Sequence, residues 1–211
     1  MEAETGPSNT NTESIHHRTP SVPMHIRGGN SSLDEARVVF VGTDNHYDPG
    51  FQGRIAHTLQ ILPQPGDVVL TEGESFGGLH GSWVPEMARV NTGEVTLMGW
   101  ENSGLYDRAT GIVREFSQNI QMLGFLSGMA LGQLAKPWID RLKQKVSNGK
   151  AEMDRVVLHE RTSAMKSAVM NVLGRRLQET GTVFVYAGSA HLTGSELGGS
   201  MNGVKHVVLG V

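Results

Sequence analysis

The stretch VFVYAGSAHLTG, Val183–Gly194, decides the fold. Its apolar residues continue up to Gly188, and a run of this kind predicts a short strand that is buried on both faces. His191 follows three residues after Gly188, just before a Thr-Gly turn. A glycine at a strand end lets the backbone turn sharply and lets a ligand come close. The stretch therefore predicts an imidazole held just beyond the end of a buried strand.

Similar apolar runs occur elsewhere in the chain. ARVVFVG (Ala36–Gly42) and DVVLTE (Asp67–Glu72) are typical of strands covered on both faces, and EVTLMGW (Glu94–Trp100) is a further candidate. Between the first two, residues 51–62 carry apolar side chains at helical spacing. Strand, helix and strand are therefore predicted to form a right-handed βαβ unit. The run VKHVVLGV supplies one more predicted strand.

Helices are predicted between the two groups of strands. Tyr106–Ala135 and Lys136–Ser147 are separated near Pro137, and Asn148-Gly149 is predicted to stop the second helix. Met153–Glu179 follows as a long helix with an apolar stripe. Strands first and last with helices between them predict an α/β fold. We expect a mainly parallel central sheet flanked by helices, with a helical insertion between the N- and C-terminal strand units.

The composition of the 211-residue chain favours one domain and a tail. Hydrophobic residues make up 38% and charged residues 18%, which is enough to bury a core. Residues 1–34 are instead rich in Ser, Thr, Asn, Pro and Gly, so we expect a flexible tail before a single domain over residues 35–211. A polar N-terminus of this kind also resembles the export signals of injected bacterial effectors.

Several classes of protein are disfavoured by the same numbers. The net charge is −3 without a basic stripe, which argues against nucleic acid as a partner, and no nucleotide-binding motif is present. Cysteine is absent, so disulfides and cysteine nucleophiles are excluded. We expect no transmembrane helix and no Sec signal peptide. The sequence therefore predicts a protein that is cytoplasmic or secreted by a non-Sec route.

Polar residues follow the ends of three predicted strands. In open α/β sheets, ligands bind beyond the carboxyl ends of the strands. We therefore expect His46, Glu72 and His191 to meet at one edge of the sheet. Three neighbours are predicted as secondary site residues: Asp44, Glu74 and Ser189.

A fourth group comes from LHERTSAM, Leu158–Met165, on the long helix. Apolar residues precede the charged pair Glu160-Arg161, and buried charges need partners. Arg161 is predicted either to hold a carboxylate, with Glu72 as the candidate, or to donate to an oxyanion. Glu160 is predicted as a secondary site residue.

Taken in order along the chain, these motifs resemble the Tiki/TraB/PrgY superfamily. HERTSAM followed by VFVYAGSAHLTG is similar to its C-terminal signature, a helix with E-R-N-x-x-M and then a strand ending in G-x-x-H-L-x-G. VFVGTDNH and DVVLTEGE are similar to its first two strand motifs, and MGWEN to a segment that some members carry. The first motif is one residue longer here, and Thr162 stands where the family commonly has Asn. The wider group includes erythromycin esterases, ChaN-type haem-binding lipoproteins and a domain of some large bacterial toxins.

The resemblance implies hydrolysis of an amide or ester bond in a peptide or small molecule. His46, Glu72, Arg161 and His191 match the family's functional positions. In one form of the reaction, His46, Glu72 and His191 hold Zn, Mn or Co, and the metal activates water. In the other, His46 acts as general base, oriented by Glu72, while Arg161 or His191 stabilises the oxyanion. Both forms remain open.

The alternative function is that of a non-enzymatic protein with the same fold. The chain is then a module that binds haem or another small ligand, or an effector or toxin domain that docks to a host protein. Haem would need an apolar slot, for which the helical methionines are candidates. The glycine-rich segment Ser75–Gly93 is predicted as a loop over the strand ends, with His80 and Trp83 as candidates for substrate contact.

Overall fold

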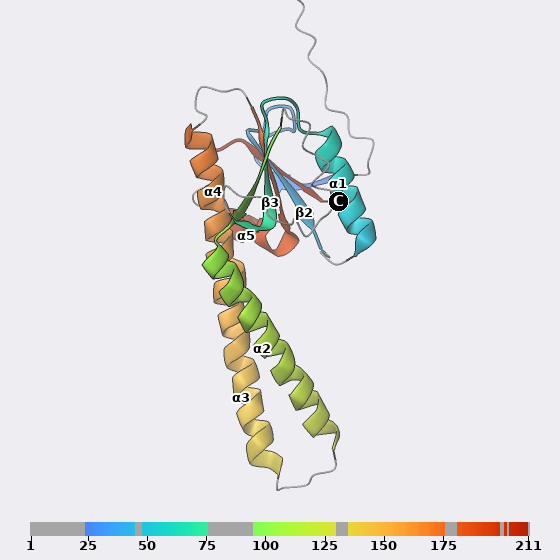
Figure 1. Ribbon diagram of the computed structural model, residues 1–211, viewed down its shortest axis with the longest axis vertical. Helices are drawn as coiled ribbons and strands as arrows, with labels where there is room; N and C mark the ends of the chain where they lie inside the picture. Colours follow the sequence, from blue (N-terminus) through green and yellow to red (C-terminus); the bar gives the residue numbers. More distant parts are fainter. Residues whose placement is uncertain are drawn as a thin grey trace, which may run out of the picture.

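A six-stranded mixed sheet forms the centre of the protein, which a computed structural model describes over residues 24–44, 48–75, 95–129, 135–175, 181–198, 201 and 203–210. The strand order is β1-β6-β2-β5-β3-β4 (Figure 1). β1 is antiparallel to β6, and the other neighbours are parallel. The predicted α/β class with a mainly parallel sheet is therefore confirmed. The strands are β1 (His25–Gly29), β2 (Val38–Thr43), β3 (Val68–Ser75), β4 (Thr96–Glu101), β5 (Val183–Gly188) and β6 (His206–Gly210).

Helices cover both faces of this sheet. α1 (Pro49–Ile61) packs on one face, where Val39 and Val41 of β2 point. α4 (Arg161–Arg175) packs on the other face, against Val38 and Phe40. Figure 1 shows α1 and α4 on opposite sides of the strands. Because successive side chains of a strand point to opposite faces, the continuous apolar runs found in β2 and β5 are what a sheet covered on both sides requires.

A long helical hairpin projects from the α/β domain (Figure 1). It consists of α2 (Ser103–Gly128) and α3 (Lys136–Glu152). Asn102 caps α2, since its side-chain oxygen accepts a hydrogen bond from the Leu105 N–H at 3.0 Å. Gly149 lies against Phe116, where an added Cβ would come within 3.1 Å of the ring. A glycine at this position therefore lets the two helices approach closely.

The helix α3 does not end where the sequence predicted. Asn148-Gly149 was expected to stop it, but the helix continues through Glu152 into the π-helix η3 (Met153–Glu160) and then into α4. Packing of Gly149 against Phe116 replaces the turn that this dipeptide favours in isolation. The end of the predicted helix Met153–Glu179 includes residues 176–180, which lie outside the described part of the chain.

Two features of the sheet also differ from the predictions. β1 belongs to the segment that was assigned to the tail, yet it pairs with β6 along the sheet edge. Its residues are exposed and include two glycines, so no apolar pattern marks it as a strand. In addition, β5 lies between β2 and β3, so the two strands of the predicted βαβ unit are not neighbours. Within the described ranges, none of the helices has both the length and the hydropathy needed to cross a membrane.

Candidate functional site

The carboxyl ends of β3, β4 and β5 bring several predicted residues together. Glu72, Arg161 and His191 are buried at this edge, and Glu72 lies next to both of the others. His46, His80 and Trp83 lie outside the described residues, and only the backbone of Glu74 is described, within β3. Three of the four residues predicted to form the centre are thus shown to converge.

Arg161 forms the middle of a buried ion network. Its Nη2 donates to Oε1 of Glu72 at 2.8 Å and to Oε1 of Glu101, while its Nε donates to Oε2 of Glu101 at 3.4 Å. The other oxygen of Glu72 accepts the Gly188 N–H at 2.7 Å. Of the two predicted roles, Arg161 therefore takes that of holding a carboxylate, and Glu72 is one of the two it holds.

Aromatic side chains enclose the network. The guanidinium of Arg161 lies 5.7 Å from the ring centroids of both Trp100 and Tyr106, within the range of cation–π attraction. Trp100 Nε1 in turn donates to the backbone oxygen of Tyr186 at 2.9 Å. Burial, together with the nearby charge of Glu72, raises the pKa of the Tyr186 hydroxyl. Water is therefore largely replaced here by aromatic surface, which strengthens every charge interaction in the network.

The pKa of Arg161 is raised although the side chain is buried. Burial by itself lowers this pKa, but the hydrogen bond to Glu101 and the charges of Glu72 and Glu101 together outweigh that effect. Arg161 therefore stays charged, and it holds two acidic side chains with its one guanidinium.

The proton position on His191 follows from its contacts. Thr162 Oγ1 donates to the backbone oxygen of Leu158 at 2.6 Å and lies 2.8 Å from Nδ1 of His191. A threonine hydroxyl has one hydrogen, and a carbonyl oxygen only accepts. The hydroxyl must therefore accept the hydrogen of Nδ1–H, which makes Nε2 the basic nitrogen of the neutral ring. Trp100 packs edge-on against this ring, with centroids 6.0 Å apart.

Nε2 of His191 faces the carboxylate of Glu72. The separation of 3.9 Å from Oε1 is too long for a direct hydrogen bond but close enough for the carboxylate to attract the ring if the ring is protonated. His191 and Glu72 have exposed fractions of 5% and 7%. The arrangement is therefore a buried imidazole with a defined tautomer, whose basic nitrogen faces a fixed negative charge.

Local structure explains how these side chains reach one another. Glu72 and Glu101 lie near the ends of the parallel neighbours β3 and β4. His191 belongs to the 3-10 helix η4 (Ser189–Leu192), which directly follows β5. Arg161 and Thr162 follow the π-helix η3, whose wider turn changes the angular position of the residues after it. π-Helical turns are rare and frequently occur at functional sites.

A second polar cluster lies on the other part of the same edge. Arg27 of β1 makes a two-pronged ion pair with Asp44, at 3.0 and 2.9 Å, and its Nη1 donates to Ser189 Oγ at 3.2 Å. Arg27 and Ser189 also line a hollow of about 420 Å³ together with Gly42 and Thr193. Asp44 and Ser189, both predicted as secondary residues, are thus joined by an arginine that was not predicted.

The Arg27–Asp44 pair gives a testable pH dependence. Hydrogen bonds from Arg27 and Ser189 lower the pKa of Asp44 from 3.8 to about 2. Because the folded-state pKa is the lower one, the pair stabilises the fold above about pH 4 and loses this contribution as the pH falls to about 2. The pair is largely exposed, so we expect it to contribute less than about 1 kcal/mol.

We expect the variant Arg27→Gln to move the Asp44 pKa back towards 3.8, as followed by NMR of the carboxyl carbon. Lys205→Gln serves as control, because it removes an exposed cation that pairs with Glu35 and not with Asp44. An Asp44 pKa that is unchanged by Arg27→Gln would contradict the assignment.

Glu160 does not join the buried network. Its carboxylate pairs with Arg108 of α2 and with Arg155 of η3. The pair Glu160-Arg161 is therefore divided, with the arginine turned to the sheet edge and the glutamate turned to the helices. Glu160, predicted as a secondary site residue, thus lies outside the network that Arg161 forms.

Two residues of the network were not predicted from sequence. Glu101 immediately follows the apolar run of β4, so the rule that led to Glu72 applies to it equally. Thr162 was noted only because the family commonly has Asn there. Its hydroxyl supplies the acceptor that sets the His191 tautomer.

The metal-dependent form of the predicted hydrolysis needs three protein ligands for the metal. The described residues supply two of them, Glu72 and His191. Within the described ranges, no group of three or more His, Cys, Asp or Glu side chains is placed to hold a metal ion. Both oxygens of Glu72 already accept hydrogen bonds, one from Arg161 and one from Gly188. A cationic guanidinium on the carboxylate competes with a metal for the same oxygens. The third predicted ligand, His46, lies outside the described residues, so the metal-dependent form stays a prediction.

Comparisons with protein-family models, with curated proteins and with solved structures found no match to this chain.

Proposed function

We propose that the protein hydrolyses an amide or ester bond, with His191 as the general base and acid. The observation that carries the proposal is the buried pair of His191 and Glu72, with Nδ1 bonded to Thr162 and Nε2 facing the carboxylate at 3.9 Å. A buried imidazole that carries its proton on Nδ1 can accept a second proton at Nε2, and a nearby carboxylate stabilises the resulting positive charge.

The reaction begins with water on Nε2 of His191. As the water oxygen adds to the carbonyl carbon of the substrate, Nε2 takes one proton, and the ring becomes an imidazolium. The negative charge of Glu72 stabilises this cation. The same Nε2–H then protonates the leaving nitrogen or oxygen, and the bond from that atom to the carbonyl carbon breaks. The ring returns to its neutral form, and acid and alcohol or amine leave.

Arg161 and Thr162 act as positioning residues in this scheme. Arg161 donates to Glu72 and Glu101 through Nη2 and so holds both carboxylates in place. Thr162 keeps the proton on Nδ1 and thereby the lone pair on Nε2. The hollow lined by Arg27, Ser189 and Thr193 lies beside η4 and offers a place for part of the substrate.

A hydrolysis screen tests the proposal directly. The purified full chain is incubated with short-chain p-nitrophenyl esters and with fluorogenic peptide amides, in the presence of EDTA. We expect turnover of at least one class above the buffer rate, since no step uses a metal. Absence of turnover in every class, or turnover only when a divalent metal replaces EDTA, would refute the proposal.

Thr162→Val tests the positioning role. The variant keeps the shape of the side chain but removes the acceptor for Nδ1–H, so the ring can rotate or take the other tautomer. We expect kcat/KM to fall roughly 10²-fold and the acidic limb of its pH profile, which reports the pKa of the general base, to move. Thr162→Ser keeps the hydroxyl and should restore both, whereas equal losses in the two variants would show a packing effect only.

A further inference from the structure

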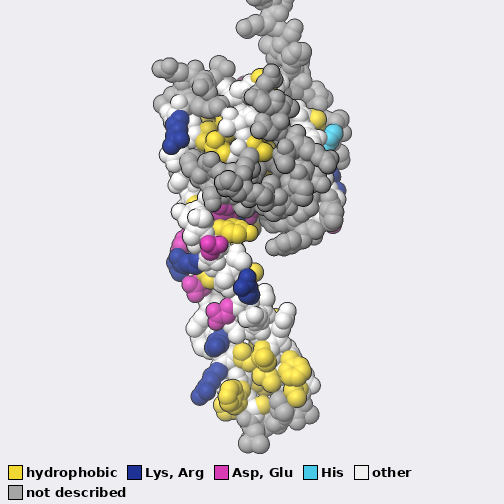
Figure 2. Space-filling model, viewed as in Figure 1, with side chains coloured by type: hydrophobic (Ala, Val, Ile, Leu, Met, Phe, Trp, Pro, Cys, Tyr) yellow, Lys and Arg dark blue, Asp and Glu magenta, His cyan; other side chains and the backbone are white. Residues whose placement is uncertain are grey.

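The distal end of the helical hairpin carries apolar side chains that no part of the described chain covers. Figure 2 shows hydrophobic side chains gathered at this end, far from the α/β domain. Phe125 and Trp138 are the most exposed of them, at 63% and 65%. We define the apolar tip by five exposed side chains. Three lie on α2, one follows directly after α2, and one lies on α3: Ile120, Met122, Phe125, Met129 and Trp138.

The tip has more apolar side chains than the contact between α2 and α3 needs. Half-buried residues of α2, such as Phe116 and Leu123, recur at seven-residue spacing and face the hairpin interior. The tip side chains lie outside this seam, and the segment Phe116–Met129 contains no charged residue. Exposed aromatic and aliphatic side chains grouped at one end of a hairpin are unusual for a surface that faces only water. An external apolar partner is therefore indicated.

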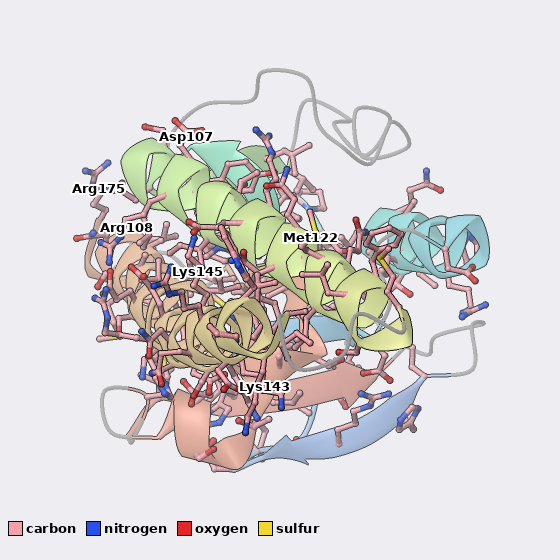
Figure 3. All side chains as sticks on the ribbon, turned by 90° about the horizontal axis from the view of Figure 1, so that it is seen from below. Asp107, Arg108, Met122, Lys143, Lys145 and Arg175 are labelled. Atoms are coloured by element: carbon pink, nitrogen blue, oxygen red, sulfur yellow. The ribbon has the colours of Figure 1, made fainter. Side chains whose placement is uncertain are left out.

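The charges beside the tip identify the kind of partner. α3 carries five basic side chains and two acidic ones, a net charge of +3, although the whole chain is at −3. Figure 3 shows Lys143 and Lys145 projecting from α3, while Met122 lies on α2. The guanidinium of Arg141 lies 6.0 Å from the centroid of the Trp138 ring, so a cation lies directly beside the tip.

We propose that the apolar tip inserts into the surface of an anionic lipid bilayer. Aromatic and aliphatic side chains would enter the outer part of one leaflet, and the lysines of α3 would contact the negative headgroups. Ile120 and Met129 are nine residues apart, about 14 Å of helix at 1.5 Å per residue. This length is about half the ~30 Å hydrocarbon thickness, so the tip enters one leaflet without crossing the bilayer.

Charge favours lipid over a second copy of the chain. Two hairpins that meet at their tips would bring two α3 helices of net charge +3 together, and like charges repel. An anionic bilayer instead offers opposite charge to the lysines and an apolar interior to the tip. Trp and Arg are also the side chains that are stable where water and hydrocarbon meet.

Vesicle co-sedimentation of the full chain tests this proposal. We expect binding to vesicles of about 30% phosphatidylglycerol in phosphatidylcholine and much weaker binding to phosphatidylcholine alone. Phe125→Ser and Trp138→Ser should each weaken binding roughly 10-fold, and the double variant Lys143→Glu/Lys145→Glu should weaken it at least about as much. Trp138 emission should shift to the blue on binding, and this shift should be absent in Trp138→Phe.

Matched control variants lie on the α/β domain. Met170→Ser removes an exposed apolar side chain of α4, and Arg175→Glu reverses a charge at its end, so both should bind like the wild type. No binding to anionic vesicles, or a loss in the controls as large as in the tip variants, would overturn the proposal. A dimer in sedimentation velocity that Phe125→Ser separates, without lipid binding, would overturn it as well and assign the tip to a second copy.

Discussion

Arg161→Met is expected to destabilise the fold by about 3–5 kcal/mol, the range for removing one partner of a buried ion pair. The substitution leaves Glu72 and Glu101 as two buried carboxylates without the guanidinium that joins them. Methionine retains much of the side-chain volume, so the loss reports charge and hydrogen bonding rather than a large cavity. Urea unfolding followed by circular dichroism measures the free energy of unfolding.

Arg155→Met provides the matched control. Arg155 precedes Arg161 by six residues and also pairs with two glutamates, Glu152 and Glu160, but all three side chains are exposed to a third or more. Solvent screens such a pair, so we expect a loss below about 1 kcal/mol. Equal losses for the two variants would show that burial adds nothing to the Arg161 network. Adding Glu101→Gln to Arg161→Met should recover part of the lost stability, because it removes one unpaired charge.

His191→Asn is expected to lower kcat/KM by roughly 10²–10⁴-fold, the usual contribution of general acid–base catalysis. The amide nitrogen of asparagine can take the place of Nδ1 and still donate to Thr162, but asparagine has no counterpart of Nε2. The variant therefore removes the proton acceptor while keeping the bond that orients the residue. Initial rates on the ester or amide substrate found in the screen, with a thermal melt of each protein, measure the effect.

His57→Ala is the control for this substitution, because His57 is exposed on α1, the helix on the opposite face of the sheet from α4. Its kcat/KM should stay within about twofold of the wild type. If His191→Asn retains the activity, the protein is a hydrolase but His191 is not its general base. Activity lost together with the thermal transition would instead assign His191 a structural role.

The central strands and the candidate site could be predicted because the relevant patterns are local. Five consecutive apolar residues in β5 report burial on both faces without knowledge of their neighbours. The rule that ligands bind beyond strand ends then led to Glu72 and His191, which the structure places 3.9 Å apart. The same rule would have led to Glu101, had it been applied to β4.

Other features depended on contacts between distant parts of the chain. β1 has no apolar pattern, and its pairing with β6 joins residues about 180 positions apart. Asn148-Gly149 favours a turn locally, but Phe116 of a different helix packs against it and the helix continues. No local pattern could predict either result, since propensity is weak compared with tertiary packing.

By itself, the sequence determined the α/β class, the buried strands and the residue types available at their ends. Only the tertiary structure decided that Arg161 lies between Glu72 and Glu101 and that Thr162 sets the proton on His191. The physical reason is that apolar periodicity is a property of a few consecutive residues. A hydrogen bond between residues 60 or 89 positions apart forms only after packing has brought them together. The chemistry of the site therefore belongs to the folded chain.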